Sequence, residues 1–295
     1  MVSADLIKQL REMTQVGFLD CKKALEQNNC DLEKAAKYLR EKGIAKASKK
    51  AGAIATEGMT LVNVCGNNGV ICEINCQTDF SANNQLFLTL GEEVKKVLVE
   101  KNVKTIDEAN AVVLSSGQSI NEACQELTAK IGEKISLRRF VKIIKQDEQD
   151  FGFYQHANKK YSALVLFSGK ISPLLAKNIA MHIVAHNPKF ISKADIDQTW
   201  LVNETNIVKQ QVLASGKPKE FADKIVQGKI NKTLGEICLC EQNFDFAEDK
   251  KISTILKENN VEILKFIRYE LGEGIAKNNV DFATEVAQQM NSNHE

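Results

Sequence analysis

The spacing of apolar residues changes near Glu57 from every third or fourth position to every second position. Upstream, residues 32–39 place their apolar side chains at i, i+3, i+4 and i+7, which is typical of one helix face. Downstream, residues 59–64 and 70–75 have the pattern of two strands around a Gly-Asn-Asn-Gly turn at 66–69. The chain therefore combines a helical beginning with antiparallel strands and further helices, and we predict an α+β fold.

The first fifty residues divide into three short helices. Ser3 is a suitable cap for the first helix, Phe18–Gln27 form the second, and Asp31 begins a third that is expected to stop at Gly43. Each is near or below the roughly 12–15 residues at which an isolated helix is marginal, so the three must pack together. A basic linker, Lys46–Lys50, is expected to follow this helical unit.

Two similar successions of elements come next. Each begins with a hairpin, continues with helical segments and closes with a late strand, Ile135–Ile144 in the first half and Val261–Tyr269 in the second. We predict two related halves, each a small antiparallel sheet covered by helices.

The second half is interrupted between Ser192 and about residue 232. The first helix of this insertion is expected at Ser192–Ser215 and carries the apolar residues Ile196, Trp200 and Ile207, the last two a heptad apart. A Gly-Lys-Pro sequence at 216–218 ends that helix and starts the return helix. Two long antiparallel helices with a sparse apolar seam predict a protruding helical hairpin of the coiled-coil type.

The overall composition excludes several classes of protein. Hydrophobic residues make up 43% and charged residues 26% of the 295 residues, and the net charge is +1, so no global field favours nucleic acid or membranes. No apolar run approaches the roughly 20 residues that span a bilayer, and Asp5 and Lys8 interrupt what would be a signal peptide. We expect a cytoplasmic protein with no direct nucleic-acid partner and no membrane partner. The eight cysteines lack CxxC spacing and are expected to be buried, reduced thiols.

Motifs for catalysis are missing from the sequence. Each of the three Gly-Lys pairs lacks the first glycine that a phosphate-binding loop requires. His182 and His186 are four residues apart on an expected helix, like half of a zinc site, but Ile183 stands where that motif has Glu and no third ligand is evident. We expect no enzyme, no catalytic residue, no cofactor and no metal site; a metal-dependent enzyme using His182 and His186 is the weaker alternative.

Six segments carry a resemblance to a known family. They are LREMTQVGFLDCKKAL (Leu10–Leu25), AKASKKAGAIATEGM (Ala45–Met59), EINCQTDFSANN (Glu73–Asn84), AKIGEKISLRR (Ala129–Arg139), SGKPKEFADKIVQGKINK (Ser215–Lys232) and FIRYELGEGI (Phe266–Ile275). In this order they closely resemble elongation factor Ts, a translation factor family that recharges elongation factor Tu. The resemblance covers essentially the whole chain.

The resemblance implies a function and a division of the chain. The function is that of a guanine-nucleotide exchange factor, which binds elongation factor Tu with GDP and promotes GDP release during translation. The division has a ubiquitin-associated-like three-helix domain at 1–54, a first core half at 55–145, a second core half at 146–275 with the hairpin at about 192–232, and a C-terminal module at 276–295.

The family's partner-activating loop matches Thr78, Asp79, Phe80 and Ser81. In the family, the Phe wedges into the GTPase domain of the partner and the loop displaces the bound Mg²⁺. Ser81 stands where the family usually has Val. From the residues alone, an aromatic such as Phe80 is more often a core residue, here at the junction of a strand and a helix. The resemblance and the polar neighbours of Phe80 favour an exposed loop tip instead.

The helical domain is expected to bind the same partner. By the resemblance, Leu10, Phe18 and Leu19 belong to the partner-binding region, and Phe18 and Leu19 are adjacent at a helix start and cannot both face one small core. The complex with elongation factor Tu is expected to be 1:1 or a 2:2 heterotetramer. The competing function is an adaptor or assembly subunit with the same helical domain and no exchange activity.

Overall fold

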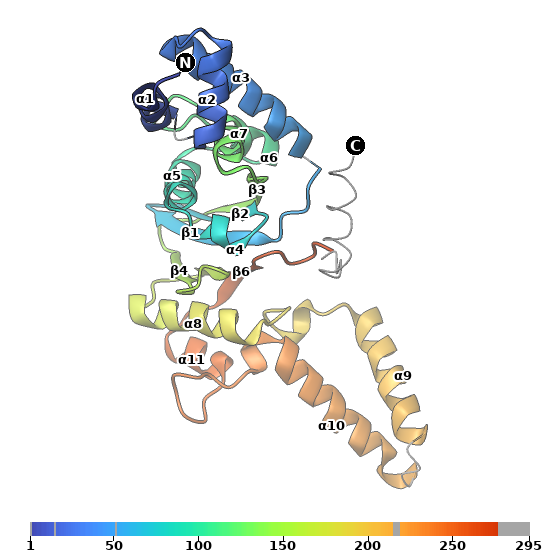
Figure 1. Cartoon of the computed structure of the whole chain (residues 1–295). Coiled ribbons are helices and arrows are strands. Elements are labelled where there is room, and N and C mark those ends of the chain that lie inside the picture. The colour runs from blue at the N-terminus through green and yellow to red at the C-terminus, as the bar shows by residue number, and fades with distance from the viewer. Residues whose placement is uncertain (1, 15, 51, 215–218, 277–295) are drawn as a thin grey trace.

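The computed structural model describes residues 2–14, 16–50, 52–214 and 219–276. Figure 1 shows these elements stacked in layers, with short helices at the N-terminal end, sheets in the middle and a long pair of helices projecting from the other end. Within the described residues, no helix is long and apolar enough to cross a bilayer. The α+β class predicted from the sequence is confirmed.

The N-terminal helices are α1 (Ala4–Thr14), α2 (Phe18–Gln27) and α3 (Leu32–Lys50). Asp31 caps α3 as predicted, since its Oδ1 accepts a hydrogen bond of 3.0 Å from the backbone N–H of Lys34. The helices share one small core of buried side chains, made of Ile7, Leu10, Cys21, Ala24, Leu25, Ala35 and Leu39.

Helix α3 is longer than predicted. It continues through Gly43 to Lys50, so Lys46–Lys50 are the end of a helix and the expected basic linker is wrong. A Cβ atom added to Gly43 would lie 2.6 Å from the Cβ of Ala129 in α7 (Ile120–Ile131). Gly43 therefore permits a close approach of two helices and does not end one.

The first sheet is an antiparallel meander in the order β1-β2-β3. Its strands are β1 (Glu57–Cys65), β2 (Asn68–Cys76) and β3 (Ser136–Ile144). Helices α5 (Gln85–Glu100), α6 (Ile106–Ala111) and α7 pack on one face of this sheet and bury its largest apolar cluster. The predicted strands of this half are confirmed to within a few residues, and helices lie between its hairpin and its late strand as predicted.

The second sheet repeats the meander in the order β4-β5-β6. Its strands are β4 (Asp150–Gln155), β5 (Tyr161–Phe167) and β6 (Ile263–Glu270). Helix α8 (Pro173–His186) and the short helix α11 (Ile252–Glu258), which the sequence analysis did not identify, cover its outer face. The predicted second half is therefore confirmed in its strands and in α8.

The inner faces of the two sheets pack against each other (Figure 1). Buried apolar side chains fill the space between them, namely Val62, Ile71, Ile143, Leu164, Leu166 and Tyr269. Polar contacts join the sheets at the edge of this layer, where Thr60 N–H donates to the carbonyl of Lys159 at 2.8 Å and the Thr60 and Ser162 hydroxyls lie 2.8 Å apart. The two halves consequently form one sheet sandwich between outer layers of helices.

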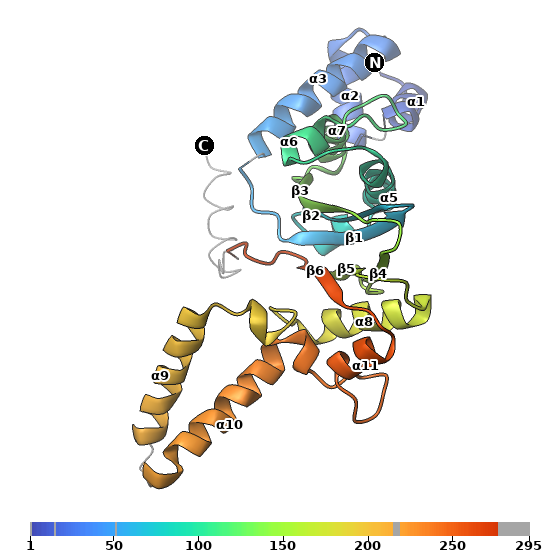
Figure 2. The ribbon, with the colours of Figure 1, turned by 180° about the vertical axis from the view of Figure 1, so that it is seen from behind.

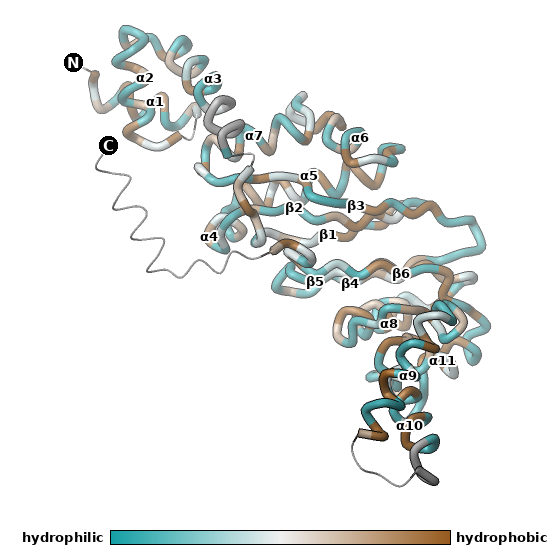
Figure 3. The backbone as a smooth tube through the Cα atoms, turned by 90° about the vertical axis from the view of Figure 1, so that its right-hand side faces the viewer, coloured by the Kyte–Doolittle hydropathy of each residue, from teal (hydrophilic) through white to brown (hydrophobic). Residues whose placement is uncertain are grey.

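The predicted insertion is a projecting helical pair, α9 (Gln198–Ala214) and α10 (Lys219–Ile237), seen from behind in Figure 2. Hydrophobic and hydrophilic segments alternate along both helices in Figure 3, as expected of helices that each bury one side. Residues 215–218, the predicted turn, lie outside the described residues, as does nearly all of the expected C-terminal module at 276–295.

The internal seam of the hairpin differs from the prediction. Ile196 is buried as expected, but Trp200 is 38% and Ile207 49% exposed. A separate cluster of buried side chains joins the helices, made of Ile196, Val208, Val212, Val226, Ile230, Leu234 and Cys238. Ser192 caps a 3-10 helix, η1 (Lys193–Asp195), and Leu239–Glu241 form another, η2.

Candidate partner-binding site

The matched loop comes directly after the central strand of the first sheet. Strand β2 ends at Cys76, and one turn of helix, α4 (Asp79–Ala82), replaces the irregular loop expected there. Thr78 caps this turn, because its Oγ1 accepts a hydrogen bond of 3.3 Å from the N–H of Ser81. The four residues are therefore in a defined conformation.

Two side-chain contacts fix the base of the loop to the turn between α7 and β3. The carboxylate of Glu133 accepts hydrogen bonds from the N–H of Thr78 at 3.0 Å and from its hydroxyl at 2.8 Å. In return, Oε1 of Gln77 accepts from the N–H of Lys134 at 2.9 Å. The segments that supply these contacts, Cys-Gln-Thr-Asp-Phe and Gly-Glu-Lys, are about 55 residues apart in sequence. These contacts hold two distant segments of the chain together at the base of the loop.

Phe80 lies at the tip of the loop and is 86% exposed. Asp79 beside it is also exposed, and its Oδ1 accepts a hydrogen bond of 2.9 Å from the N–H of Phe80. Ser81, in contrast, is only 4% exposed and faces the protein interior. The expectation of an exposed aromatic tip is confirmed over the core alternative, and the side chain of Ser81 cannot contact a partner in this conformation.

The strand that leads to the loop also carries a buried ionic cluster that the sequence analysis missed. Glu73 in β2 is fully buried; its Oε1 lies 2.8 Å from Nη1 of Arg138 and its Oε2 lies 2.6 Å from Nε of Arg139. The N–H of Gly272, just after β6, donates to the same carboxylate at 2.9 Å. Glu73 thus ties the central strand of the first sheet to the end of the second sheet. The sequence signal for this cluster was Glu73 itself, a charged residue within the apolar run of β2.

The charge of Glu73 is stabilised by these contacts. Burial alone would raise the pKa of Glu73, but the hydrogen bonds from Gly272, Arg138 and Arg139 outweigh it, and the pKa is lowered. The carboxylate is therefore ionised at neutral pH and holds the side chains of both arginines against β2.

In the helical domain, the predicted partner-binding residues separate into two groups. Phe18 is 51% and Leu19 70% exposed at the start of α2, and Met13 at the end of α1 is 61% exposed. Leu10 is 0% exposed because it fills the core of the helical unit. The prediction that Leu10 contacts a partner is corrected accordingly: its side chain supports the helices that carry Phe18 and Leu19.

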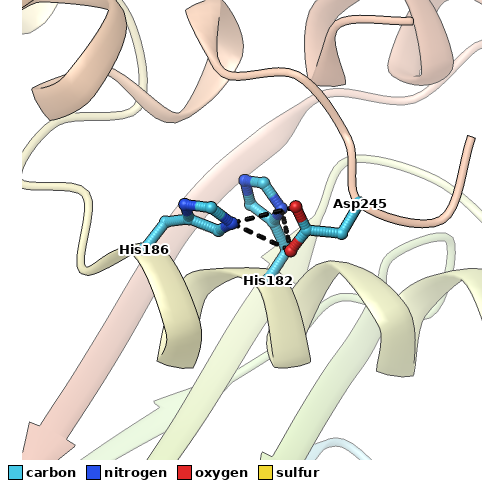
Figure 4. Close-up of side chains that lie close together, drawn as sticks. All are labelled: His182, His186 and Asp245. Atoms are coloured by element: carbon cyan, nitrogen blue, oxygen red, sulfur yellow. Dashed lines mark hydrogen bonds and ion pairs between the residues drawn. The ribbon is translucent and has the colours of Figure 1, made fainter. Parts of the chain in front are cut away.

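A second group of polar side chains lies far from the loop, on the outer layer of the second half (Figure 4). His182 and His186 from α8 meet Asp245, which comes after η2, and one ligand atom from each lies within 4.8 Å of the others. The sequence analysis found no third residue for these histidines because Asp245 is 59 residues from His186. Burial, reinforced by the nearby His186, lowers the pKa of His182, although the hydrogen bond with Gln242 and the nearby Asp245 oppose this shift.

Comparison with known proteins places this architecture in a family. The sequence model described as Elongation factor TS matches residues 77–273. Elongation factor Ts of Malacoplasma penetrans (strain HF-2) is 45% identical over 292 residues, which cover 98% of this chain and 99% of that protein. Elongation factor Ts of Acholeplasma laidlawii (strain PG-8A) is 44% identical over 294 residues, covering 98% and 99% respectively.

An α+β protein with a rigidly held, exposed aromatic loop has the form of a partner-binding factor. The chain belongs to the elongation factor Ts family, whose members are translation elongation factors.

Proposed function

We propose that this chain is a guanine-nucleotide exchange factor for elongation factor Tu and that Phe80 is its principal acting side chain. The observation that carries the proposal is the exposed position of Phe80 on a loop whose base is held by Glu133, in a chain of the elongation factor Ts family. The partner binds GDP through its phosphates and a Mg²⁺ ion, so disturbing that pocket is sufficient to release the nucleotide.

The form of the loop suits insertion into a partner. Phe80 offers a large apolar area with few rotatable bonds, so little conformational entropy is lost when it enters a pocket. The contacts of Thr78 with Glu133 and the cap on Ser81 order the backbone before binding. Asp79 places a negative charge next to Phe80. That charge can compete with the phosphates of the bound nucleotide for the positive groups of the partner's phosphate and Mg²⁺ site.

Exchange of this kind results from reciprocal coupling between two ligands of the partner. The bound factor weakens GDP binding by a certain free energy, and bound GDP weakens binding of the factor by the same free energy. Each 1.4 kcal/mol of this coupling that is expressed in the transition state speeds release about tenfold. The chain makes and breaks no covalent bond in this mechanism, so it needs no nucleophile, general base or cofactor of its own.

The helical domain supplies a separate docking surface in this proposal. Phe18 and Leu19 are exposed next to each other on α2, and α3 holds the domain against α7 through the close contact at Gly43. Docking there would raise the local concentration of the loop at the GTPase domain without itself accelerating release. A complex of either 1:1 or 2:2 stoichiometry is compatible with this arrangement.

The experiment is a release assay with elongation factor Tu loaded with a fluorescent GDP analogue and chased with excess GDP. We expect the full chain to speed release by orders of magnitude, and the acceleration to weaken as free Mg²⁺ is raised, because the factor and Mg²⁺ oppose each other. Binding of the chain without acceleration at any Mg²⁺ concentration would favour the adaptor function. Absence of both binding and acceleration would reject elongation factor Tu as the partner.

A further inference from the structure

We propose that His182, His186 and Asp245 form a binding site for one divalent transition-metal ion of the zinc type, which fastens the segment after η2 to helix α8. His182 and His186 come from α8, and Asp245 comes from the segment after η2, which is distant from α8 in the sequence (Figure 4). The site is separate from the loop of Phe80, so it goes beyond the proposed exchange function.

The spacing of the ligand atoms fits such an ion. Nε2 of His186 lies 2.9 Å from Oδ2 of Asp245, and Nδ1 of His182 lies 3.2 Å from the same oxygen. Ligands at about 2.0–2.1 Å from a tetrahedral zinc ion are roughly 3.3–3.4 Å apart. Both distances to Asp245 are within a few tenths of an ångström of this spacing, and the two histidine nitrogens lie within 4.8 Å of each other.

Neighbouring groups determine which nitrogen of His182 faces the site. Nε2 of Gln242 donates a hydrogen bond of 2.6 Å to the carbonyl of Glu236, so the amide oxygen of Gln242 must be the atom that lies 3.0 Å from Nε2 of His182. An oxygen acceptor at that position requires a proton on Nε2. The lone pair of a neutral His182 is then on Nδ1 and points at Asp245.

Nδ1 of His182 is left in an unfavourable environment without a bound cation. The residue is 0% exposed, and no described residue forms a hydrogen bond of acceptable geometry with this atom. A lone pair and a carboxylate oxygen 3.2 Å apart repel each other, and a buried acceptor without a donor costs free energy. Either a second proton on the imidazole or a metal ion between the two atoms removes the conflict.

A metal ion explains more of the arrangement than a proton does. A proton on His182 would make an ion pair with Asp245, but it would also place a positive charge in the interior beside the imidazole of His186, whose ring stacks on it at 4.2 Å. A metal ion would bind all three side chains at once. The hydrogen bond from Nε2 of His182 to Gln242 is the kind of outer contact that orients a metal-bound histidine.

Access and donor chemistry are also suitable. His186 is 43% and Asp245 44% exposed at the side chain, so an ion can enter and a water molecule can complete its coordination. Two imidazoles and one carboxylate are a donor set found in zinc sites with an open position. The sequence-based expectation of no metal site depended on the lack of a third ligand, which Asp245 supplies.

Titration with Co²⁺, a coloured substitute for Zn²⁺, tests the site directly. The full chain without an affinity tag is freed of metal with a chelator, and binding is followed by visible absorption and calorimetry. We expect one equivalent of Co²⁺ to bind with nitrogen and oxygen ligation, Zn²⁺ to displace it, and the melting temperature to rise with Zn²⁺ concentration. A thiolate charge-transfer band would instead assign the metal to cysteines and overturn the proposal.

Two substitutions and two controls locate the ion. We expect Asp245→Asn and His186→Ala, both at exposed positions, to weaken binding at least about 100-fold, the upper end of what loss of an outer contact causes. Asp249→Asn removes an exposed carboxylate nearby, and His156→Ala removes a histidine outside the site; both should bind as the unmodified chain does. Lack of stoichiometric binding, or equal binding by all four variants, would overturn the proposal. The release assay is not involved, so either outcome leaves the exchange function to its own test.

Discussion

The two core halves have the same three-stranded meander but differ in the segment directly after the middle strand. After β2, a capped helical turn presents Phe80 to solvent. After β5, Ser168 turns back onto the chain instead, because its N–H donates to the carbonyl of Glu262 at 2.9 Å and its hydroxyl accepts from the N–H of Glu262 at 2.8 Å. The sheet therefore does not require an exposed aromatic tip, which is consistent with the proposed role of Phe80 in binding a partner.

The buried polar groups of the two halves differ as well. In the first half, both oxygens of the Glu73 carboxylate have donors, although Oδ1 of Asn75, whose amide group donates to the same carboxylate at 3.0 Å, has no hydrogen-bond partner among the described residues. In the second half, His182 has a partner for one nitrogen, while the other faces a carboxylate. The charge of Glu73 is paired within the chain and serves stability, whereas a histidine lone pair that faces a carboxylate can take a cation.

The largest effect is expected from breaking the ionic cluster of Glu73. Glu73→Ala leaves Arg138, Arg139 and the N–H of Gly272 without their buried partner, and we expect a loss of about 3–5 kcal/mol in the free energy of unfolding. Urea denaturation followed by circular dichroism measures it. As a control from the second half, Glu258→Ala removes an exposed pair with Lys250 and should cost less than about 1 kcal/mol. Equal losses would mean that the buried cluster has no special role.

Loss of the aromatic tip should affect exchange but not folding. We expect Phe80→Ala to slow GDP release from elongation factor Tu roughly 10–100-fold, the loss of an interface contact of about 1.4–2.8 kcal/mol. Because Phe80 is 86% exposed, the free energy of unfolding should change by less than about 0.5 kcal/mol. Release rates and urea curves are measured on the same preparations.

Leu174→Ala, which removes a 69% exposed apolar side chain from the second half, is the matched control and should retain normal exchange. A stable Phe80→Ala protein with normal exchange would remove the residue from the mechanism.

Acid should weaken the first half through Glu73. The pKa of Glu73 is lower in the folded protein than the value of about 4.3 for an unfolded glutamate, so the unfolded state binds more protons in this range. The stabilisation is present above the unfolded pKa and is lost as the pH falls through the folded pKa. Unfolding curves between pH 7 and pH 3 should therefore converge for the unmodified chain and Glu73→Gln. A difference that stays constant to pH 3 would show that the charge of Glu73 is not what stabilises the cluster.

The order of elements was predictable because it depends on local patterns. The strand predicted at Ile135–Ile144 begins one residue later in the structure, and Phe80, which the family motif placed at an exposed tip, is exposed. The errors concern contacts between distant segments. Gly43 had the local features of a helix stop, and only the approach of Ala129 shows why the helix continues.

The same reason explains the residues that were missed or misassigned. Asp245 joins His182 and His186 across a long stretch of chain, and no local spacing marks it as their partner. Trp200 and Ile207 fit a heptad, but the return helix packs on the neighbouring positions Val208 and Val212. Partner-binding roles are harder still to predict, since Leu10 and Leu19 are both apolar helix residues and only the packed structure separates the buried one from the exposed one.

The smallest effect on the core is expected from removing the hairpin, an element that the first half lacks. The hairpin has its own buried cluster, and backbone hydrogen bonds outside α9 hold its base. The N–H of Leu239 donates to the carbonyl of Phe190 at 2.9 Å, and the N–H of Cys240 donates to the carbonyl of Ile191 at 2.9 Å. Replacing residues 197–235 with a short Gly-Ser turn shortens a long connection, and loop closure depends only weakly on length. We expect cooperative unfolding with a melting temperature within a few degrees of the unmodified chain.

Thiol labelling then shows which parts of the chain the replacement of the hairpin disturbs. Burial raises the pKa of Cys72 and of Cys124 to about 12, so these thiols of the first half should stay unreactive at neutral pH in both proteins. Cys238 is buried against the hairpin and should become reactive only in the shortened chain. Labelling of Cys72 after the replacement, or loss of cooperative unfolding, would show that the hairpin is part of the sandwich and that the two halves differ less in organisation than their structures indicate.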